Sequence, residues 1–205
     1  NDSEKTLREH TLLANAVNWV VNNYSLPEGL NIDSDDDGRI DNVCFVIRGS
    51  ADGWNDLLWP HRWVLYSFPV KIGSLTVWGY TVQLENVSVG TFSHELFHAL
   101  GAPDLYHYNN TEVPVGPWAI MANGKGHPGA WMKYIYGTWI PKIPEITESG
   151  TYYIKPLEQA SKTSYILKSP YRDDQFFVLE FRNKSGVYES RIPSSGLIIT
   201  RIDTK

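Results

Sequence analysis

Two histidines and a glutamate, all within five consecutive positions, are the residues of this chain best suited to chemistry. His94 and His98 are four residues apart, so a helix would bring both imidazoles to one face, about 6 Å apart along its axis. That arrangement suits two ligands of one zinc ion. Glu95 would project about 100° round the helix from His94, so that its carboxylate reaches a water beside the metal without being a ligand. We predict that His94 and His98 bind zinc and that Glu95 is a general base.

The turn after these residues offers a third ligand. Gly101 allows the left-handed backbone that ends a helix, and Pro103 prevents its continuation, so the chain can turn back toward the histidines. We predict that Asp104 is the third zinc ligand, since three protein ligands and one open position describe a catalytic zinc site. His107 is a rival third ligand at a longer spacing. The alternative for the whole segment is an amphipathic helix whose histidines are ordinary hydrogen-bonded side chains.

The segment T-F-S-H-E-L-F-H-A-L-G-A-P-D at residues 91–104 resembles a known family signature. It is similar to the metzincin clan of zinc metallopeptidases, with Asp104 in place of the more usual third histidine. Within that clan it most resembles the immune inhibitor A-like secreted bacterial metallopeptidases, which carry H-E-x-x-H-A-L-G-x-P-D. The resemblance implies an α+β fold with a twisted mixed sheet, a zinc-binding active-site helix, a Met-turn and a closing helix. It also implies that Met121, within residues 118–124, is the Met-turn residue, and that the protein is secreted or lies on the bacterial cell surface.

The composition is that of a globular chain. With 205 residues, 42% of them hydrophobic, it can bury a full core. The formal net charge is -5 without a basic cluster, so nucleic acid is not an expected partner. No apolar run is long enough to span a bilayer, and residues 1–4 lack the form of a signal peptide, as in a chain from which one has been removed. The one cysteine, Cys44, is predicted to be a buried thiol.

The pattern of apolar residues changes after residue 144, where short alternating stretches predict a small antiparallel β extension at 145–205. The resemblance implies that residues 1–144 form the catalytic domain. In the first domain we predict a helix at 6–24, a buried strand at 43–49, strands at 65–70 and 75–84, and a helix that opens at 127–128 and runs through 135. In the extension we predict strands at 151–154, 164–167, 176–181 and 196–202. By resemblance, a strand within 79–87 forms the exposed edge with which a peptide substrate pairs.

An acidic segment at 33–41 predicts a second metal site. Carboxylates at alternate positions, with Gly38 at the sixth, form the front half of an EF-hand-like calcium loop. The predicted ligands are Asp33, Asp35, Asp37, the Arg39 carbonyl and Asp41. The full motif has a bidentate glutamate at its twelfth position, where this chain has Cys44, so a solvated acidic turn is the alternative. Immune inhibitor A-like enzymes carry a similar segment, which favours calcium.

These residues together predict a zinc-dependent endopeptidase that acts on a protein or peptide substrate. The rival hypothesis is a non-catalytic, calcium-stabilised surface or adhesion module that retains the metal site as a structural element. Glu95 favours the enzyme, because a structural site has no use for a base. Another zinc hydrolase, such as an amidase, is a third hypothesis. We interpret His61 as structural rather than as a ligand, and Tyr106 and Tyr108 as packing residues rather than oxyanion donors.

Overall fold

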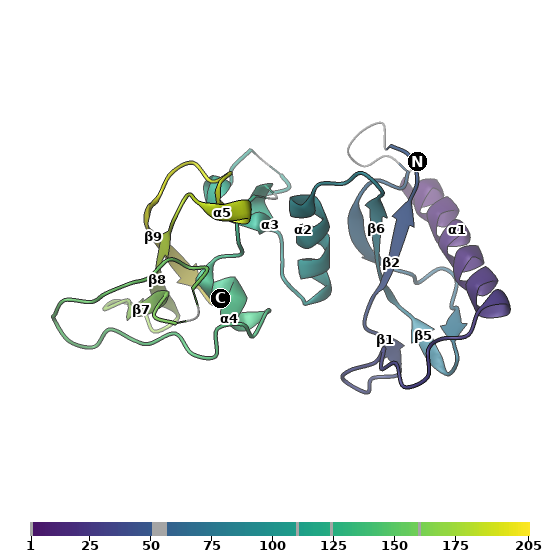
Figure 1. The fold of residues 1–205 in the computed structure, drawn as a ribbon, viewed down its shortest axis with the longest axis horizontal. Helices are drawn as coiled ribbons and strands as arrows, with labels where there is room; N and C mark the ends of the chain where they lie inside the picture. The colour runs from purple at the N-terminus through teal and green to yellow at the C-terminus, as the bar shows by residue number, and fades with distance from the viewer. Residues whose placement is uncertain (1, 51–56, 110, 124, 160) are drawn as a thin grey trace. The chain divides into compact units, whose positions relative to one another are not determined.

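A computed structural model describes residues 2–50, 57–109, 111–123, 125–159 and 161–205. The chain forms two compact units, Asn1–Ala99 and Leu100–Lys205 (Figure 1). Helices and strands both contribute, so the fold is mixed α+β. Residues 145–205 belong to the same unit as residues 100–144, and the boundary that we predicted at residue 144 falls inside that unit. In the described parts of the chain, no helix has both the length and the apolar character needed to cross a membrane.

The described residues of the first unit form two helices and two small sheets. The long amphipathic helix α1 confirms the helix predicted at 6–24. One three-stranded sheet has the order β2-β6-β3, and the other has the order β1-β5-β4. The elements are α1 (Asp2–Asn23), β1 (Arg39–Ile40), β2 (Val43–Ile47), β3 (His61–Val64), β4 (Lys71–Ile72), β5 (Leu75–Val77), β6 (Gly79–Leu84) and α2 (Val89–Ala99).

Strand β6 is the centre of its sheet and of the core of the first unit. It pairs in parallel with β2 and antiparallel with β3. Tyr80 and Val82 have no exposed surface and cluster with Leu13 of α1. Thr81 and Gln83 alternate with them along the strand and are also buried, on the side where α2 contacts β6 and β3. Figure 1 shows this sheet between α1 and α2. The strand that leads into α2 is therefore held on both faces and both edges.

Three predictions about these strands are wrong. No strand forms at 65–70, where Pro69 has no N–H to donate to a ladder, and residues 61–64 form β3 instead. The strand predicted at 75–84 is interrupted at Trp78, so that β5 and β6 join different sheets. The strand predicted within 79–87 as an exposed edge is β6, which has a hydrogen-bonded neighbour on each side. The edges of that sheet are β2 and β3.

Cys44 is exposed rather than buried. Its strand, β2, confirms the strand predicted at 43–49, but its residues alternate between half-buried and exposed. Phe45 and Ile47 pack against the core, whereas Val46 is 63% exposed. β2 is an edge strand, and α2 packs mainly on β6 and β3. Among the described residues, the face of β2 that carries Cys44 and Val46 is therefore exposed.

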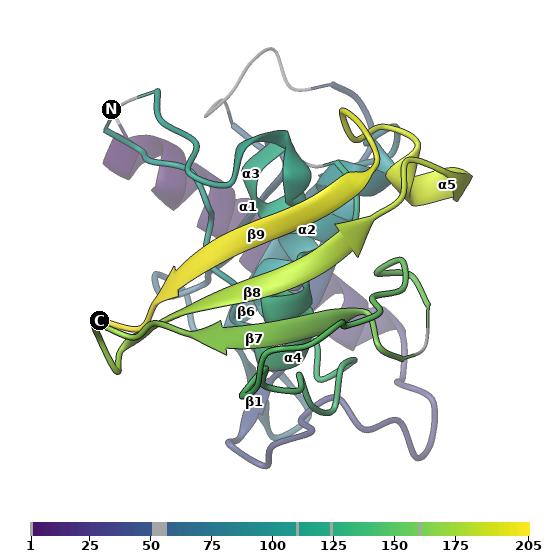
Figure 2. The ribbon, with the colours of Figure 1, turned by 90° about the vertical axis from the view of Figure 1, so that its left-hand side faces the viewer.

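The second unit contains an antiparallel sheet with the order β7-β8-β9. Figure 2 shows β8 lying between the other two strands. This sheet confirms the strands predicted at 164–167, 176–181 and 196–202. The elements are the 3-10 helix η1 (Gly116–Trp118), α3 (Ile120–Asn123), α4 (Ala130–Ile135), β7 (Ser164–Lys168), β8 (Gln175–Arg182), α5 (Gly186–Glu189) and β9 (Gly196–Asp203).

Helix α4 packs on one face of this sheet and confirms a helix through residue 135, but it begins at Ala130 rather than at the predicted 127–128. Ala130 of α4 and Val178 of β8 are buried together with Leu157. The strand predicted at 151–154 is not formed. Its Tyr153 side chain is 80% exposed, and the backbone bridge to β7 comes instead from Glu145. Two adjacent tyrosines are thus not enough to make a strand at residues 151–154, which pair with no strand in the part of the chain that the structure describes.

Candidate active site

Helix α2 places the imidazoles of His94 and His98 side by side. The Nε2 atoms of the two rings lie 3.1 Å apart, and the ring planes are inclined at 87°. Two nitrogens held by one tetrahedral zinc ion at 2.0–2.1 Å lie about 3.3 Å apart. The two rings therefore already have nearly the spacing and convergence that a shared zinc ion requires.

Glu95 lies in the same cluster. One oxygen of its carboxylate and one ring nitrogen of each histidine all lie within 4.8 Å of one another. Its side chain is buried, at 7% exposure, whereas both histidines are half-buried. The three residues that were predicted from their spacing are thus brought together, with the carboxylate beside the pair of nitrogens.

The local sequence explains why a helix forms at this position. Ser88 precedes the first helical residue, and its hydroxyl oxygen accepts a hydrogen bond from the Thr91 N–H at 3.1 Å. Such an N-cap stabilises a helix by about 1 kcal/mol. Phe97 is buried and fixes which face of α2 is turned inward. The helix ends at Ala99, and Gly101 has the left-handed φ of 93° that was predicted for the turn.

Asp104 and Met121 are linked through the backbone of the second unit. The Leu105 N–H, next to Asp104, donates to the carbonyl oxygen of Met121 at 2.9 Å. The Tyr108 hydroxyl donates to Oδ2 of Asp104, so this tyrosine contacts the predicted ligand rather than serving only for packing. His107, the rival ligand, is exposed.

Met121 has no exposed surface and lies in the short helix α3. The turn that carries it is closed by the Ala122 N–H, which donates to the Ala119 carbonyl at 3.0 Å. A buried methionine in a tight turn is consistent with the Met-turn expected from the resemblance. Gly124, the last residue of that predicted segment, lies outside the described residues.

The acidic segment forms a compact loop with converging carboxylates. Oxygens of Asp33, Asp35 and Asp37 all lie within 4.8 Å of one another. Oδ1 and Oδ2 of Asp33 accept hydrogen bonds from the N–H groups of Asp37 and Gly38 at 3.1 and 3.0 Å. Asp41 joins the loop from its far end, where its carboxylate accepts from the Ser34 N–H at 3.2 Å. The predicted side-chain ligands therefore belong to one loop.

His61 forms a buried pair with Glu9, a residue that sequence reasoning missed. Its Nε2 lies 3.0 Å from Oε1 of Glu9, its Nδ1 lies 2.6 Å from the Trp59 carbonyl oxygen, and its ring stacks on Trp59. The Tyr80 hydroxyl donates to the same Glu9 oxygen at 2.7 Å. Both ring nitrogens are thus engaged, which agrees with a structural role for His61. The signal in the sequence was a glutamate four residues before Leu13, on the core-facing stripe of α1.

The charges of this pair shift each other's pKa. Burial by itself lowers the pKa of His61, but the hydrogen bond and negative charge of Glu9 raise it above its ordinary value. Burial by itself raises the pKa of Glu9, but the hydrogen bond and positive charge of His61 and the Tyr80 hydroxyl hold it below its ordinary value. The pair is therefore most stable as imidazolium and carboxylate.

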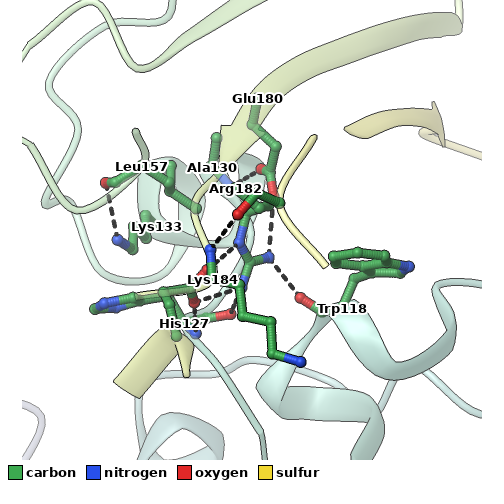
Figure 3. Close-up of polar contacts among 10 residues, drawn as sticks. Trp118, His127, Ala130, Lys133, Leu157, Glu180, Arg182 and Lys184 are labelled. Atoms are coloured by element: carbon green, nitrogen blue, oxygen red, sulfur yellow. Dashed lines mark hydrogen bonds and ion pairs between the residues drawn. The ribbon is translucent and has the colours of Figure 1, made fainter. Parts of the chain in front are cut away.

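A second buried ionic cluster lies in the second unit and was also missed. Arg182 and Glu180 lie close together (Figure 3), on the same face of β8 as Val178. Both are buried, as is Glu189. Arg182 donates from Nε and Nη2 to the two oxygens of Glu189 at 2.7 and 2.6 Å. Opposite charges two residues apart, on the core-facing side of a strand, were the signal available in the sequence.

Comparison with known proteins identifies the family. The family model for the immune inhibitor A peptidase M6 catalytic domain matches residues 34–153. Immune inhibitor A of Bacillus thuringiensis subsp. alesti is 31% identical over 121 residues, which cover 50% of this chain and 17% of that protein. The pre-pro-metalloprotease PrtV of Vibrio cholerae serotype O1 is 30% identical over 110 residues, 46% of this chain and 12% of that protein. The chain thus spans less than a fifth of the length of these relatives.

The matched range contains all the residues of the candidate zinc site. It begins within the acidic loop, includes the three clustered residues of α2 together with Asp104 and Met121, and continues past α4. It covers more than half of the chain. The chain therefore belongs to the immune inhibitor A peptidase M6 family of metallopeptidases.

Proposed function

We propose that this chain is the catalytic part of a zinc-dependent endopeptidase. The observation that carries the proposal is the 3.1 Å approach of the His94 and His98 Nε2 atoms, with a buried carboxylate from Glu95 in the same cluster. Membership of a metallopeptidase family supports it. Two imidazoles that can bind the metal, with one carboxylate beside them that can act as a base, are the groups expected on the helix of a catalytic zinc site.

The ligands in this proposal are His94, His98 and Asp104. Asp104 follows the left-handed turn at Gly101, and the hydrogen bond from Tyr108 orients its carboxylate. Its negative charge would temper the Lewis acidity of the metal relative to a site with three neutral histidines. Met121 would be the Met-turn residue, and α4 would be the closing helix of the metzincin-like fold that the resemblance implies.

The chain's own residues would move the proton during peptide hydrolysis. When bound, zinc would polarise the scissile carbonyl and lower the pKa of the attacking water toward about 7. Glu95 would accept the proton from that water as its oxygen attacks the carbonyl carbon. Glu95 would then pass the proton to the leaving amine nitrogen, which restores the carboxylate for the next turnover.

An extended peptide substrate would bind at the edge of the β2-β6-β3 sheet. β6 has no free edge, but in the described part of the chain β3 has a neighbouring strand on one side only. β3 also contacts α2, which carries the histidines. Its unpaired N–H and C=O groups would form a ladder with the substrate backbone. This choice of β3 replaces the edge that we predicted at 79–87.

We also propose that the loop at 33–41 binds calcium and that the protein acts outside the cell. Converging oxygens of Asp33, Asp35 and Asp37 support the calcium site, because calcium prefers several oxygen ligands. The rival hypothesis of a non-catalytic adhesion module would use the same loop. The adhesion-module hypothesis gives no role to Glu95, because a structural metal site has no use for a buried carboxylate that is not a ligand.

The test is to measure bound zinc and casein cleavage in parallel for the native chain, Glu95→Gln and Glu28→Gln. Glu28→Gln is the matched control, because it makes the same change from carboxylate to amide in an exposed turn outside the site. We expect zinc in all three proteins, and cleavage lowered about 10²- to 10⁴-fold in Glu95→Gln alone. Full cleavage by Glu95→Gln with zinc bound would refute its role as the base. Zinc without cleavage in the native chain would favour the adhesion module.

A further inference from the structure

We propose that Arg182 is a positioning residue for the zinc site. Together with Glu180 and Glu189, it fixes the backbone on both sides of the Met121 turn and, through that turn, the backbone next to Asp104. The inference rests on the proposed function, because it assigns a role to residues outside the site in holding the third ligand. It gives the β-rich part of the chain a role in metal binding.

The guanidinium of Arg182 uses its full set of donors. It forms the bidentate pair with Glu189, and Nη1 donates to Oε1 of Glu180 at 3.2 Å. Nη1 also donates to the carbonyl oxygen of Trp118 at 2.5 Å, and Nη2 to that of His127 at 3.4 Å (Figure 3). Arg182 has no exposed surface, so no water competes for these bonds. A planar fork that meets two carboxylates and two carbonyls holds them in one geometry.

Glu180 and Glu189 bind the backbone on the other side of the turn, after Met121. Oε1 of Glu189 accepts from the His127 N–H at 2.7 Å, and Oε2 of Glu180 accepts from the Ala130 N–H at 2.5 Å. The cluster therefore fixes the backbone at Trp118, before Met121, and at His127 and Ala130, after it. Glu180 accepts from the turn segment and from Arg182 on different oxygens, whereas Oε1 of Glu189 accepts from both the His127 N–H and Nη2 of Arg182.

The turn passes this constraint on to the residue beside Asp104. Trp118 ends η1, and Met121 lies in α3 directly after it. The Met121 carbonyl accepts from the Leu105 N–H at 2.9 Å. A continuous path of hydrogen bonds and short backbone segments thus runs from Glu189 through Arg182, Trp118 and Met121 to Leu105. A shift of the Trp118 carbonyl would move the carbonyl that holds Leu105.

The packing around the cluster allows little adjustment. Gly126, between the turn and α4, has φ of 69°, and a Cβ built there would lie 2.8 Å from both Nη2 of Arg182 and Cγ2 of Ile192. The backbone therefore lies directly against the guanidinium. A side chain with a different shape at position 182 could not hold the turn without moving this backbone.

A purely stabilising role makes a different prediction. Buried ion clusters often contribute little net stability compared with apolar residues of similar volume. If Arg182 only stabilised the unit, a folded variant would bind zinc and turn over as the native chain does. A positioning role predicts that the folded variant binds zinc more weakly and has an altered ligand geometry.

The experiment uses the full chain and the variants Arg182→Met, Glu189→Gln and Arg172→Met. Met keeps much of the apolar stem of Arg182 without the fork, and Gln keeps the shape of Glu189 without its charge. Arg172 is the matched control, because it forms a bidentate pair with Asp174 on the surface. Zinc affinity is measured by chelator competition, and ligand geometry by the visible absorption spectrum of the Co²⁺-substituted protein. The kinetic constants kcat and KM are measured on one peptide substrate.

We expect Arg182→Met to bind zinc roughly 10- to 100-fold more weakly, as for other residues that orient metal ligands, with a changed Co²⁺ spectrum and a lower kcat at unchanged KM. Glu189→Gln should change in the same direction by less, and Arg172→Met should match the native chain. If Arg182→Met does not fold, Glu189→Gln decides. A folded variant with native zinc affinity and spectrum overturns the positioning role alone, whereas a native chain that binds no zinc overturns the proposed function as well.

Discussion

The Nε2 atoms of His94 and His98 face each other at 3.1 Å on a helix that follows directly from the central strand of its sheet. Two ring nitrogens at this distance need either a shared proton or a shared metal ion between them. Ordinary surface histidines on a helix would be free to point apart into solvent rather than hold their Nε2 atoms toward each other. The spacing of the pair is therefore the feature from which the predictions about zinc follow.

Asp104→Ala should lose zinc, whereas His107→Ala should keep it. Loss of a ligand should weaken zinc binding by more than the roughly 10- to 100-fold that changes to surrounding residues cost. His107 is exposed, whereas Asp104 is half-buried, so removal of His107 should change the affinity little. Chelator competition on both variants gives the answer. The reverse result would make His107 the third ligand.

Calcium should stabilise the native chain through the loop at 33–41. A ligand at 100 times its dissociation constant adds about 2.7 kcal/mol to the free energy of unfolding, which appears as a higher midpoint of thermal unfolding. Asp35→Asn removes one of the converging carboxylates and should reduce this gain. Asp36→Asn is the control, since Asp36 has φ of 59°, which asparagine tolerates, and it lies outside the cluster. Equal gains for both variants would place calcium elsewhere.

The Glu9–His61 pair should make stability depend on pH in a defined sense. His61 has a raised pKa in the folded protein, so its contribution is complete below its ordinary value of 6.5 and is lost as the pH rises through the raised value. Glu9 has a lowered pKa, so its contribution is present above 4.5 and is lost as the pH falls through the lowered value. The pair should therefore stabilise the fold most between pH 4.5 and pH 6.5, the ordinary pKa values of the two groups.

The measurement for this pair is the difference in unfolding free energy between the native chain and His61→Gln, from acidic to alkaline pH. We expect the difference to be largest in mildly acidic solution and to shrink as the pH rises. An NMR titration of the His61 ring gives a direct check. A His61 pKa below 6.5 in the folded chain would contradict the predicted ion pair.

Cys44 should react with a thiol reagent in the folded state. Its exposure on the open face of β2 predicts labelling of one thiol per chain under native conditions, at a rate near that of the same chain in denaturant. Phe45→Ala, which alters the opposite, core-facing side of the strand, serves as a positive control for loosened packing. Labelling that begins only after unfolding would restore the buried thiol that the sequence suggested.

Local spacing explains what could be predicted from the sequence. His94, Glu95 and His98 lie within one turn and a half of helix, so their geometry depends on α2 alone. The helix α1 and the strands β7, β8 and β9 likewise follow from periodicity within short windows. The acidic loop is also local, because its hydrogen bonds join residues 33–41.

Pairing between distant segments explains what was missed. The Glu9–His61 bond spans 52 positions and the Arg182–Trp118 bond spans 64, and no local pattern specifies either. The central position of β6 in its sheet depends on pairing with the distant strands β2 and β3, which the sequence of β6 alone does not specify. For the same reason the apolar run at β2 was predicted to be buried, although its Cys44 and Val46 side chains are exposed.

The central position of β6 also implies an order of assembly. β6 is the last strand of its sheet in the chain and is inserted between two earlier ones, so the sheet cannot close before it arrives. Contacts between such distant segments form slowly during folding. Since α2 follows at once, we expect the histidine pair to form late. Zinc capture during refolding would then report on the closure of this sheet.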